Sequence, residues 1–160
     1  MLHNQRLTGS LDGEFVVFLI GLRVNQPLRV DKWLPPVSAM TRMIGELRRQ
    51  PQLGLLHAEM WTSRTTIMVQ YWRSMEQLLS YAKSKDAQHL PAWRAFNKAV
   101  ENNGAVGIWH ETYTAGPGTY ETFYRNMPSF GLGKAGRLEE AVSGKHSAAG
   151  RLGRAESARS

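Results

Sequence analysis

The chain has 160 residues, a formal net charge of +7 and no cysteine. This length suits one domain with a modest core, and the lack of cysteine excludes disulfides, thiolate metal sites and cysteine nucleophiles. The charge does not indicate nucleic acid binding, because six Lys and Arg residues lie from Lys134 onward and no basic stripe with interleaved aromatics precedes them. The longest apolar run, residues 15–22, is too short to span a bilayer, and the polar N-terminus lacks the apolar segment of a secretory signal. We therefore expect a cytoplasmic protein with no nucleic acid and no membrane partner.

The first half of the chain predicts three strands and a helix. Residues 14–25, EFVVFLIGLRVN, are apolar at consecutive positions and rich in β-branched and aromatic side chains, as in a strand that is buried on both faces. After a proline-punctuated loop over 26–36, a helix is expected over 37–50, where apolar residues recur at helical spacing. Residues 53–62 and 65–72 predict the two strands of a hairpin, since only a short polar turn separates them.

The second half predicts two helical regions and a final strand. Ser74 is a natural N-cap for a helix over 75–85, with a glutamine three residues further on. Helical spacing resumes over 91–104 and stops at an Asn-Gly pair, a common C-terminal signal. Residues 105–115, AVGIWHETYTA, predict the last strand. The resulting order, βαββαβ, is that of a ferredoxin-like α+β fold.

We expect three segments: the ferredoxin-like domain over 14–116, an aromatic arm over 117–136 and a basic tail over 137–160. The tail holds few large apolar side chains, too few to offset the entropy lost on ordering, so we predict that it is mobile. The strands leave little room for a solvated sheet face, because their apolar residues are consecutive. A second copy of the same sheet is the simplest cover, and we therefore predict a homodimer.

Several segments resemble a known superfamily. The segment YWRSMEQLLSYAKSKDAQHLPAWRAFNKAV, residues 71–100, and the closing GIWHETY, residues 107–113, resemble the dimeric α+β barrel superfamily, which includes antibiotic-biosynthesis-type monooxygenases and haem-binding relatives. More narrowly, FVVFLIGLRVNQPLRVDKWLPPVSAM and YETFYRNMPSFGLGKAG resemble a monooxygenase-like branch that is named after a fungal enzyme of terpenoid-polyketide biosynthesis. The resemblance covers residues 14–136 and implies a ligand pocket between the sheet and the two helices of each subunit.

His89 and Trp93 match a feature that the resemblance implies, a histidine followed four residues later by an aromatic, both near the pocket. Pro91 disfavours helix at residue 90, so His89 also stands at a break between two helices. It either caps this break or faces the pocket as a proton acceptor or an axial iron ligand. Trp93, one helical turn further on, and Phe96 belong either to the core or to the pocket.

Other candidates lie on the strands. Trp72 and Arg73 end the third strand, near the pocket in the proteins that the chain resembles, where Arg73 either binds an anionic or carbonyl oxygen or is a surface cation. His110 lies on the last strand, and His57 is expected to share a strand face with Leu55. Each histidine lines either the pocket or the dimer interface, and no metal-ligand spacing joins them, so no metal site is predicted.

The leading hypothesis is a monooxygenase-like enzyme of secondary or xenobiotic metabolism that oxidises an apolar, electron-rich small molecule. The sequence has no nucleotide-binding loop and no metal motif, which fits oxygenation without a metal or flavin, with His89 as the general base and Trp93 excluding water. The first alternative is a haem enzyme, aldoxime-dehydratase-like or haem-oxygenase-like, with His89 as the proximal ligand. The second alternative is a dimeric module that binds a ligand without turnover.

Overall fold

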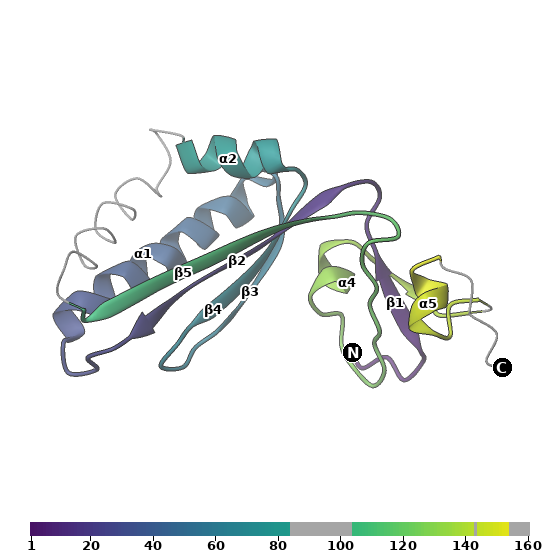
Figure 1. Ribbon diagram of the computed structural model, residues 1–160, viewed down its shortest axis with the longest axis horizontal. Coiled ribbons are helices and arrows are strands. Elements are labelled where there is room, and N and C mark those ends of the chain that lie inside the picture. Colours follow the sequence, from purple (N-terminus) through teal and green to yellow (C-terminus); the bar gives the residue numbers. More distant parts are fainter. Residues whose placement is uncertain (84–103, 143, 154–160) are drawn as a thin grey trace.

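The computed structural model describes residues 1–83, 104–142 and 144–153. Figure 1 shows two parts side by side: a twisted antiparallel sheet with helices over one face, and a smaller part built by the N-terminal strand and the segments that follow the last long strand. No helix within these three ranges is long and apolar enough to cross a membrane.

The larger part contains a four-stranded sheet in the order β3-β4-β2-β5, with all neighbours antiparallel. Helices α1 and α2 lie over the same face of this sheet (Figure 1). This strand order with helices on one face is the ferredoxin-like arrangement, which confirms the predicted α+β fold class. The bounds of these elements are β2 Phe15–Val24, α1 Val30–Arg49, β3 Leu55–Trp61, β4 Ile67–Trp72, α2 Met75–Lys83 and β5 Val106–Ala115.

Helix α1 differs from its prediction, whereas α2 begins as expected. The loop expected over 26–36 is wrong in its second half, because α1 begins at Val30 and includes Pro35 and Pro36. Each proline removes one helical N–H donor, but Pro36 is buried against the sheet together with the apolar side of the helix, and this burial offsets the loss. At the start of α2, the backbone N–H of Gln77 donates to the Ser74 hydroxyl at 3.2 Å, which confirms the predicted cap.

The strand register divides the sheet into a face under the helices and an open face. Phe18 pairs with Gln70 on the covered face, and the next pair, Val17 with Tyr71, points the other way. The covered face and the helices share the main core, whose most buried members include Val16, Leu47, Met68 and Trp72. The continuous apolar run of β2 therefore supplies both faces, as the sequence predicted.

A β-bulge changes the face of one histidine. The register of β3 shifts between Leu55 and His57, so Leu55 packs in the core while His57 lies on the open face opposite Tyr71. The prediction that these two residues share a face is wrong, because a bulge interrupts the two-residue alternation of a strand. The ring N–H of His57 donates to the Glu59 carboxylate at 2.9 Å.

The open face is partly covered by the arm that follows β5. The ring of Phe130 packs edge-on against Trp61 with centroids 5.7 Å apart, and the Lys134 ammonium lies 3.7 Å from a Glu59 carboxylate oxygen. Helix α4 (Leu132–Ala135) thus lies over strand β3. Towards β5 this cover ends, and Tyr113 is 52% exposed.

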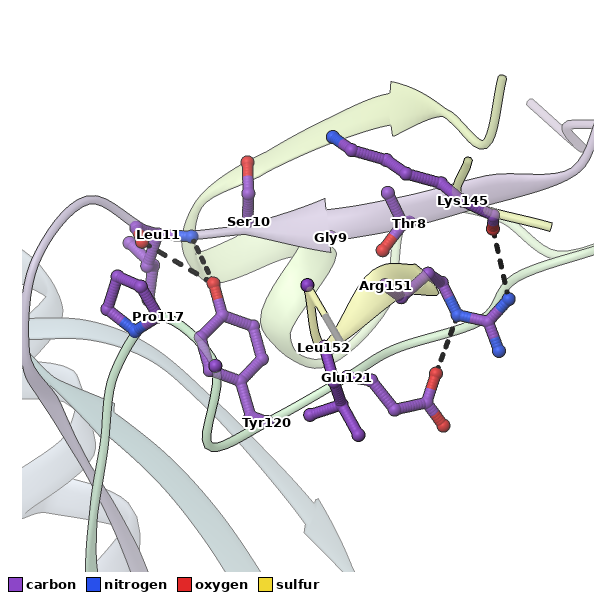
Figure 2. Close-up of a pocket in the computed structure, with 12 residues that line it drawn as sticks. Thr8, Gly9, Ser10, Leu11, Pro117, Tyr120, Glu121, Lys145, Arg151 and Leu152 are labelled. Carbon is purple, nitrogen blue, oxygen red and sulfur yellow. Dashed lines mark hydrogen bonds and ion pairs between the residues drawn. The ribbon is translucent and has the colours of Figure 1, made fainter. Parts of the chain in front are cut away.

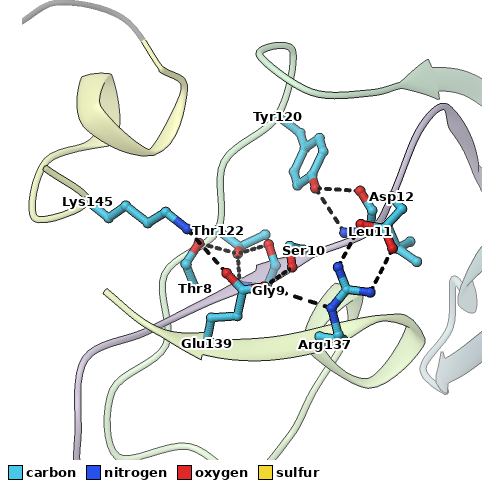
Figure 3. Close-up of polar contacts among 10 residues, drawn as sticks. All are labelled: Thr8, Gly9, Ser10, Leu11, Asp12, Tyr120, Thr122, Arg137, Glu139 and Lys145. Atoms are coloured by element: carbon cyan, nitrogen blue, oxygen red, sulfur yellow. Dashed lines mark hydrogen bonds and ion pairs between the residues drawn. The ribbon is translucent and has the colours of Figure 1, made fainter. Parts of the chain in front are cut away.

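The smaller part contains a second sheet that the sequence did not predict. Strand β1 (Leu7–Ser10) pairs antiparallel with β6 (Arg137–Glu140), and a short helix, α5 (Ala148–Arg151), follows. Figure 3 shows the polar contacts that join the two strands, including the Arg137 fork on Asp12 and the hydrogen bond from Ser10 to Glu139. The predicted mobile tail is therefore corrected for 137–142 and 144–153, since residues before the expected domain start at 14 supply its pairing partner.

Candidate functional site

A cavity of about 290 Å³ lies between the covered face of the sheet and helices α1 and α2. The sheet contributes residues from β2 and β4, and the helices contribute their apolar sides because these recur at helical spacing. Most of the wall is aliphatic, thioether or aromatic. The lining residues are Phe18, Ile20, Pro36, Ala39, Met40, Met43, Ile44, Leu47, Gln70, Trp72, Leu78, Tyr81 and Ala82.

Two neighbouring residues of β4 bring polar atoms to this wall. The indole N–H of Trp72 donates to the side-chain oxygen of Gln70 at 2.8 Å. The Gln70 amide nitrogen in turn lies 3.2 Å from the sulfur of Met68. All three side chains point to the covered face, since they alternate along one strand, and Gln70 is only 5% exposed. A buried amide is therefore held in a fixed orientation at the cavity wall.

Tyr81 on α2 adds a third polar group. Its hydroxyl donates to a carboxylate oxygen of Glu46 on α1 at 3.1 Å, and its ring stacks at a tilt on Trp72 with centroids 5.7 Å apart. Burial, together with the nearby Glu46 carboxylate, raises the pKa of Tyr81 well above its usual value. The hydroxyl thus stays protonated at neutral pH and links the two helices across the cavity.

Of the predicted site residues that the structure describes, one lines the cavity and the others do not. Trp72 lines the cavity. His110 faces the same side of the sheet, with its ring 6.0 Å from that of Phe18, but it is exposed and outside the lining. Arg73 is also exposed, and its backbone N–H donates to the carbonyl of Gly54 at 2.9 Å. The remaining predicted residues, His89, Trp93 and Phe96, lie outside the described residues.

His57 and His110 lie on opposite faces of the sheet, so they do not form a common site. His57 pairs across the ladder with Tyr71 on the open face, and His110 pairs with Ile20 on the covered face. Within the described ranges, no cluster of three or more His, Cys, Asp or Glu side chains is placed to hold a metal ion.

Gln70 and Tyr81 are the site residues that sequence reasoning missed. Gln70 is the one strong polar residue inside the apolar run of β4, and this interruption was a usable signal. Tyr81 follows Leu78 at helical spacing on α2, so its pattern indicated only a core position. Neither signal reveals the partners, because Glu46 comes from another helix.

The described lining contains neither of the usual proximal ligands of a haem. Among these residues none is histidine or cysteine, and Tyr81 donates its hydroxyl to Glu46, which leaves Met40 and Met43 as side chains of an axial-ligand type. None of them is Lys or Arg, which would pair with the carboxylates of a porphyrin. The proximal ligand of the haem alternative, His89, lies outside the described residues.

A second cavity, of about 330 Å³, lies in the smaller part between β1, α5 and the arm that follows β5 (Figure 2). Its charged groups are already paired. The Arg151 guanidinium donates to Glu121 at 2.7 Å and to the carbonyls of Lys145 and His146, and the Lys145 ammonium bonds Glu139 at 3.2 Å. The Tyr120 hydroxyl accepts from the backbone N–H of Leu11. Because the charged groups of this cavity bond one another, we take the first cavity, whose wall is mostly apolar with a few polar groups, as the candidate site.

The strand order and the helices on one face define an α+β protein of ferredoxin-like fold, with an apolar cavity beneath the helices. The chain belongs to the family described as monooxygenase af470-like, whose model matches residues 15–132. It is 29% identical over 133 residues to Monooxygenase af470 of Aspergillus fumigatus (strain ATCC MYA-4609 / CBS 101355 / FGSC A1100 / Af293), an alignment that covers 76% of this chain and 46% of that protein. The chain thus spans about half the length of this curated relative.

Two solved structures resemble the chain at lower identity. SnoaB, a cofactor-independent oxygenase from Streptomyces nogalater, has a TM-score of 0.46 and 17% identity, over 64% of this chain and 93% of SnoaB. A conserved protein from Methanosarcina mazei Go1 has a TM-score of 0.45 and 10% identity, over 61% of this chain and 90% of that one.

Proposed function

We propose that this chain is a monooxygenase-like enzyme that oxidises an apolar, electron-rich small molecule in the cavity under α1 and α2. The observation that carries the proposal is the lining of this cavity, which is apolar except for Gln70, Trp72 and Tyr81. Sites of this composition bind the carbon skeleton of a ligand through burial and orient it through a few polar groups. Membership of the monooxygenase af470-like family supports oxygenation as the reaction.

The proposed reaction needs only the substrate, dioxygen and a base. Removal of a proton from an activated CH2 group gives a carbanion, which adds dioxygen to form a peroxide. Loss of water from the protonated peroxide leaves a carbonyl, so CH2 and O2 become C=O and H2O without a metal or flavin. In this proposal His89 takes the proton as general base, and Trp93 helps to exclude water.

The reaction is tested with isotopically labelled dioxygen. Enolisable aromatic ketones are incubated with the purified protein, a chelator and ¹⁸O₂, with no flavin added, and products are analysed by mass spectrometry. The proposal expects one ¹⁸O atom in the product carbonyl and one in water. Ketones that bind the cavity but consume no dioxygen would instead favour the non-catalytic binding module. A Soret band with hemin that is lost in His89→Asn would favour the haem enzyme.

We also propose that the chain forms a homodimer through the part of the open sheet face that α4 leaves uncovered. Val17, Leu19 and Trp109 are only half-buried there, and Tyr113 is exposed. A second sheet packed on these residues would remove their apolar surface from water. Sedimentation equilibrium at micromolar concentration tests this: Tyr113→Glu is expected to shift a dimer towards monomer, and a wild-type monomer would contradict it.

A further inference from the structure

The orientation of the Gln70 amide follows from the chemistry of its neighbour. An indole N–H is only a donor, so the atom of Gln70 that lies 2.8 Å from Trp72 Nε1 is the amide oxygen. The NH2 group is thereby directed away from Trp72 and toward Met68, on a side chain that lines the cavity. No other assignment of the amide satisfies the indole, which is 1% exposed as a residue.

The NH2 group of Gln70 has only a weak hydrogen-bond acceptor among the described residues. It carries two N–H groups, and among the described residues its partner is the thioether sulfur of Met68, at 3.2 Å. A thioether is a weak acceptor, and a buried donor without a good acceptor destabilises the fold. Gln70 is 5% exposed, so water does not readily supply the missing acceptor. A ligand oxygen in the cavity would satisfy this donor.

The surroundings of Gln70 restrict the ligand to one kind of polar group. The described lining contains no cation, so a carboxylate or phosphate would enter without a counter-charge. The rest of the wall is apolar, with the Tyr81 hydroxyl already donating to Glu46. A single carbonyl oxygen on an otherwise apolar ring system matches this arrangement. In the deprotonated substrate the same oxygen carries the enolate charge, and a fixed N–H donor stabilises it.

We propose that Gln70 is the specificity-determining donor of the cavity: its side-chain N–H groups bind the carbonyl or enolate oxygen of an otherwise apolar ring substrate, and Trp72 holds the amide in the required orientation. This inference rests on the proposed function, because it names the substrate class of the same cavity. Gln70 contacts the substrate, whereas Trp72 acts as a positioning residue through Gln70.

The test compares two ligands that differ in one oxygen. Fluorenone is a rigid tricyclic ketone with no enolisable hydrogen, so its binding is measured without turnover, and fluorene has the same skeleton without the oxygen. Titration calorimetry with wild type is expected to show tighter binding of fluorenone. Gln70→Met, which keeps an unbranched side chain of similar length, is expected to weaken fluorenone about tenfold and fluorene less than about twofold.

Two further variants distinguish hydrogen-bond donation by Gln70 from the packing of the side chains around it. Met68→Leu removes the competing thioether and is expected to leave fluorenone binding equal or tighter. Trp72→Phe keeps an aromatic ring but removes the indole N–H, and is expected to reduce the preference for fluorenone by about threefold. Infrared difference spectra supply a readout that packing does not move: the carbonyl stretch of bound fluorenone shifts to lower frequency in wild type and returns in Gln70→Met.

The outcomes distinguish this inference from the proposed function. If neither compound binds wild type, the cavity does not take apolar rings, and both proposals fail. If both bind wild type and Gln70→Met with unchanged affinities and no carbonyl shift, the assignment of Gln70 is overturned while the cavity remains a ligand site.

Discussion

The two parts of the molecule differ in how the polar side chains around their cavities are bonded. In the smaller part, the charged groups around the second cavity bond one another, as with Arg151 and Glu121 at 2.7 Å. In the larger part, the cavity wall is apolar, and its buried amide, Gln70, has only a thioether as acceptor for its N–H groups in the described structure. A satisfied network stabilises a local fold, whereas an under-used buried donor next to empty volume is suited to a ligand. This difference supports the proposed ligand site in the larger part, whereas the bonded charges of the smaller part stabilise its local fold.

The largest expected effect concerns turnover at the larger part. If His89 is the general base, His89→Asn keeps the fold but lowers turnover by about 10²- to 10⁴-fold, measured as dioxygen consumption on any ketone that the wild type oxidises. The matched control is His146→Asn, which changes an exposed histidine of the smaller part. It is expected to leave turnover unchanged. Full turnover in a folded His89→Asn variant would contradict the general-base role of His89.

The next effect concerns stability. Leu47 on α1 is 1% exposed and lies in the main core, so Leu47→Ala is expected to lower the free energy of unfolding by about 2 to 5 kcal/mol. Arg137→Ala, which removes the exposed ion pair with Asp12, is expected to stay within experimental error, because exposed pairs contribute little. Urea unfolding measures both. Equal losses would contradict this expectation, because the exposed ion pair would then stabilise the fold as much as the buried leucine does.

A truncation tests whether the smaller part can open while the larger part stays folded. A chain that stops after residue 136 lacks β6, so β1 loses its pairing partner. The N–H groups of Leu7 and Gly9 donate to Tyr124 and Thr122, so those of Thr8 and Ser10, which alternate with them, face β6. Amide exchange at Thr8 and Ser10 is then expected to become fast, while the amides of β2 and β4 keep their protection. The amide N–H of Tyr124, which donates to the Leu7 carbonyl, provides an internal comparison. Retained protection at Thr8 and Ser10 would show that β6 does not stabilise β1.

The smallest effect is a pH dependence confined to the smaller part. The hydrogen bond from Arg137 lowers the pKa of Asp12, and those from Ser10 and Lys145 lower the pKa of Glu139. A carboxylate with a lowered folded pKa stabilises the fold above its unfolded value, and this contribution is lost as the pH falls through the folded value. As the pH falls below about 4, the protection factors of the β1 amides, which correct for the slower intrinsic exchange at low pH, should fall before those of the β2 amides do. A simultaneous change in both strands would contradict this order.

The elements that could be predicted from the sequence are those whose pattern is local. Strands β2 and β4 can be recognised from their own apolar residues, and the start of α2 from its capping serine, Ser74. Strands β1 and β6 have no such signal, because four residues form a strand only when a partner more than a hundred positions away pairs with them. The bulge after Leu55 likewise depends on the register with β4.

The residues of the candidate site could likewise be predicted only in part from the sequence. Trp72 was predicted at the end of its strand, and the structure places it in the cavity wall. The role proposed for Gln70 could not be predicted, because it follows from a hydrogen bond with Trp72 that is known only from the folded structure. Tyr81 resembles a core residue until its contact with Glu46, on a different helix, is known.

The most direct test of the account is to fill each cavity in turn. Ala39 is 2% exposed in the wall of the first cavity, and Pro117 lies in the wall of the second. Fluorenone affinity is measured by calorimetry for Ala39→Phe and Pro117→Phe, with circular dichroism to confirm that both variants fold. The account predicts that Ala39→Phe weakens binding by about tenfold or more, while Pro117→Phe binds as the wild type does. The reverse pattern, with binding lost only in Pro117→Phe, would contradict the assignment of the substrate site to the larger part.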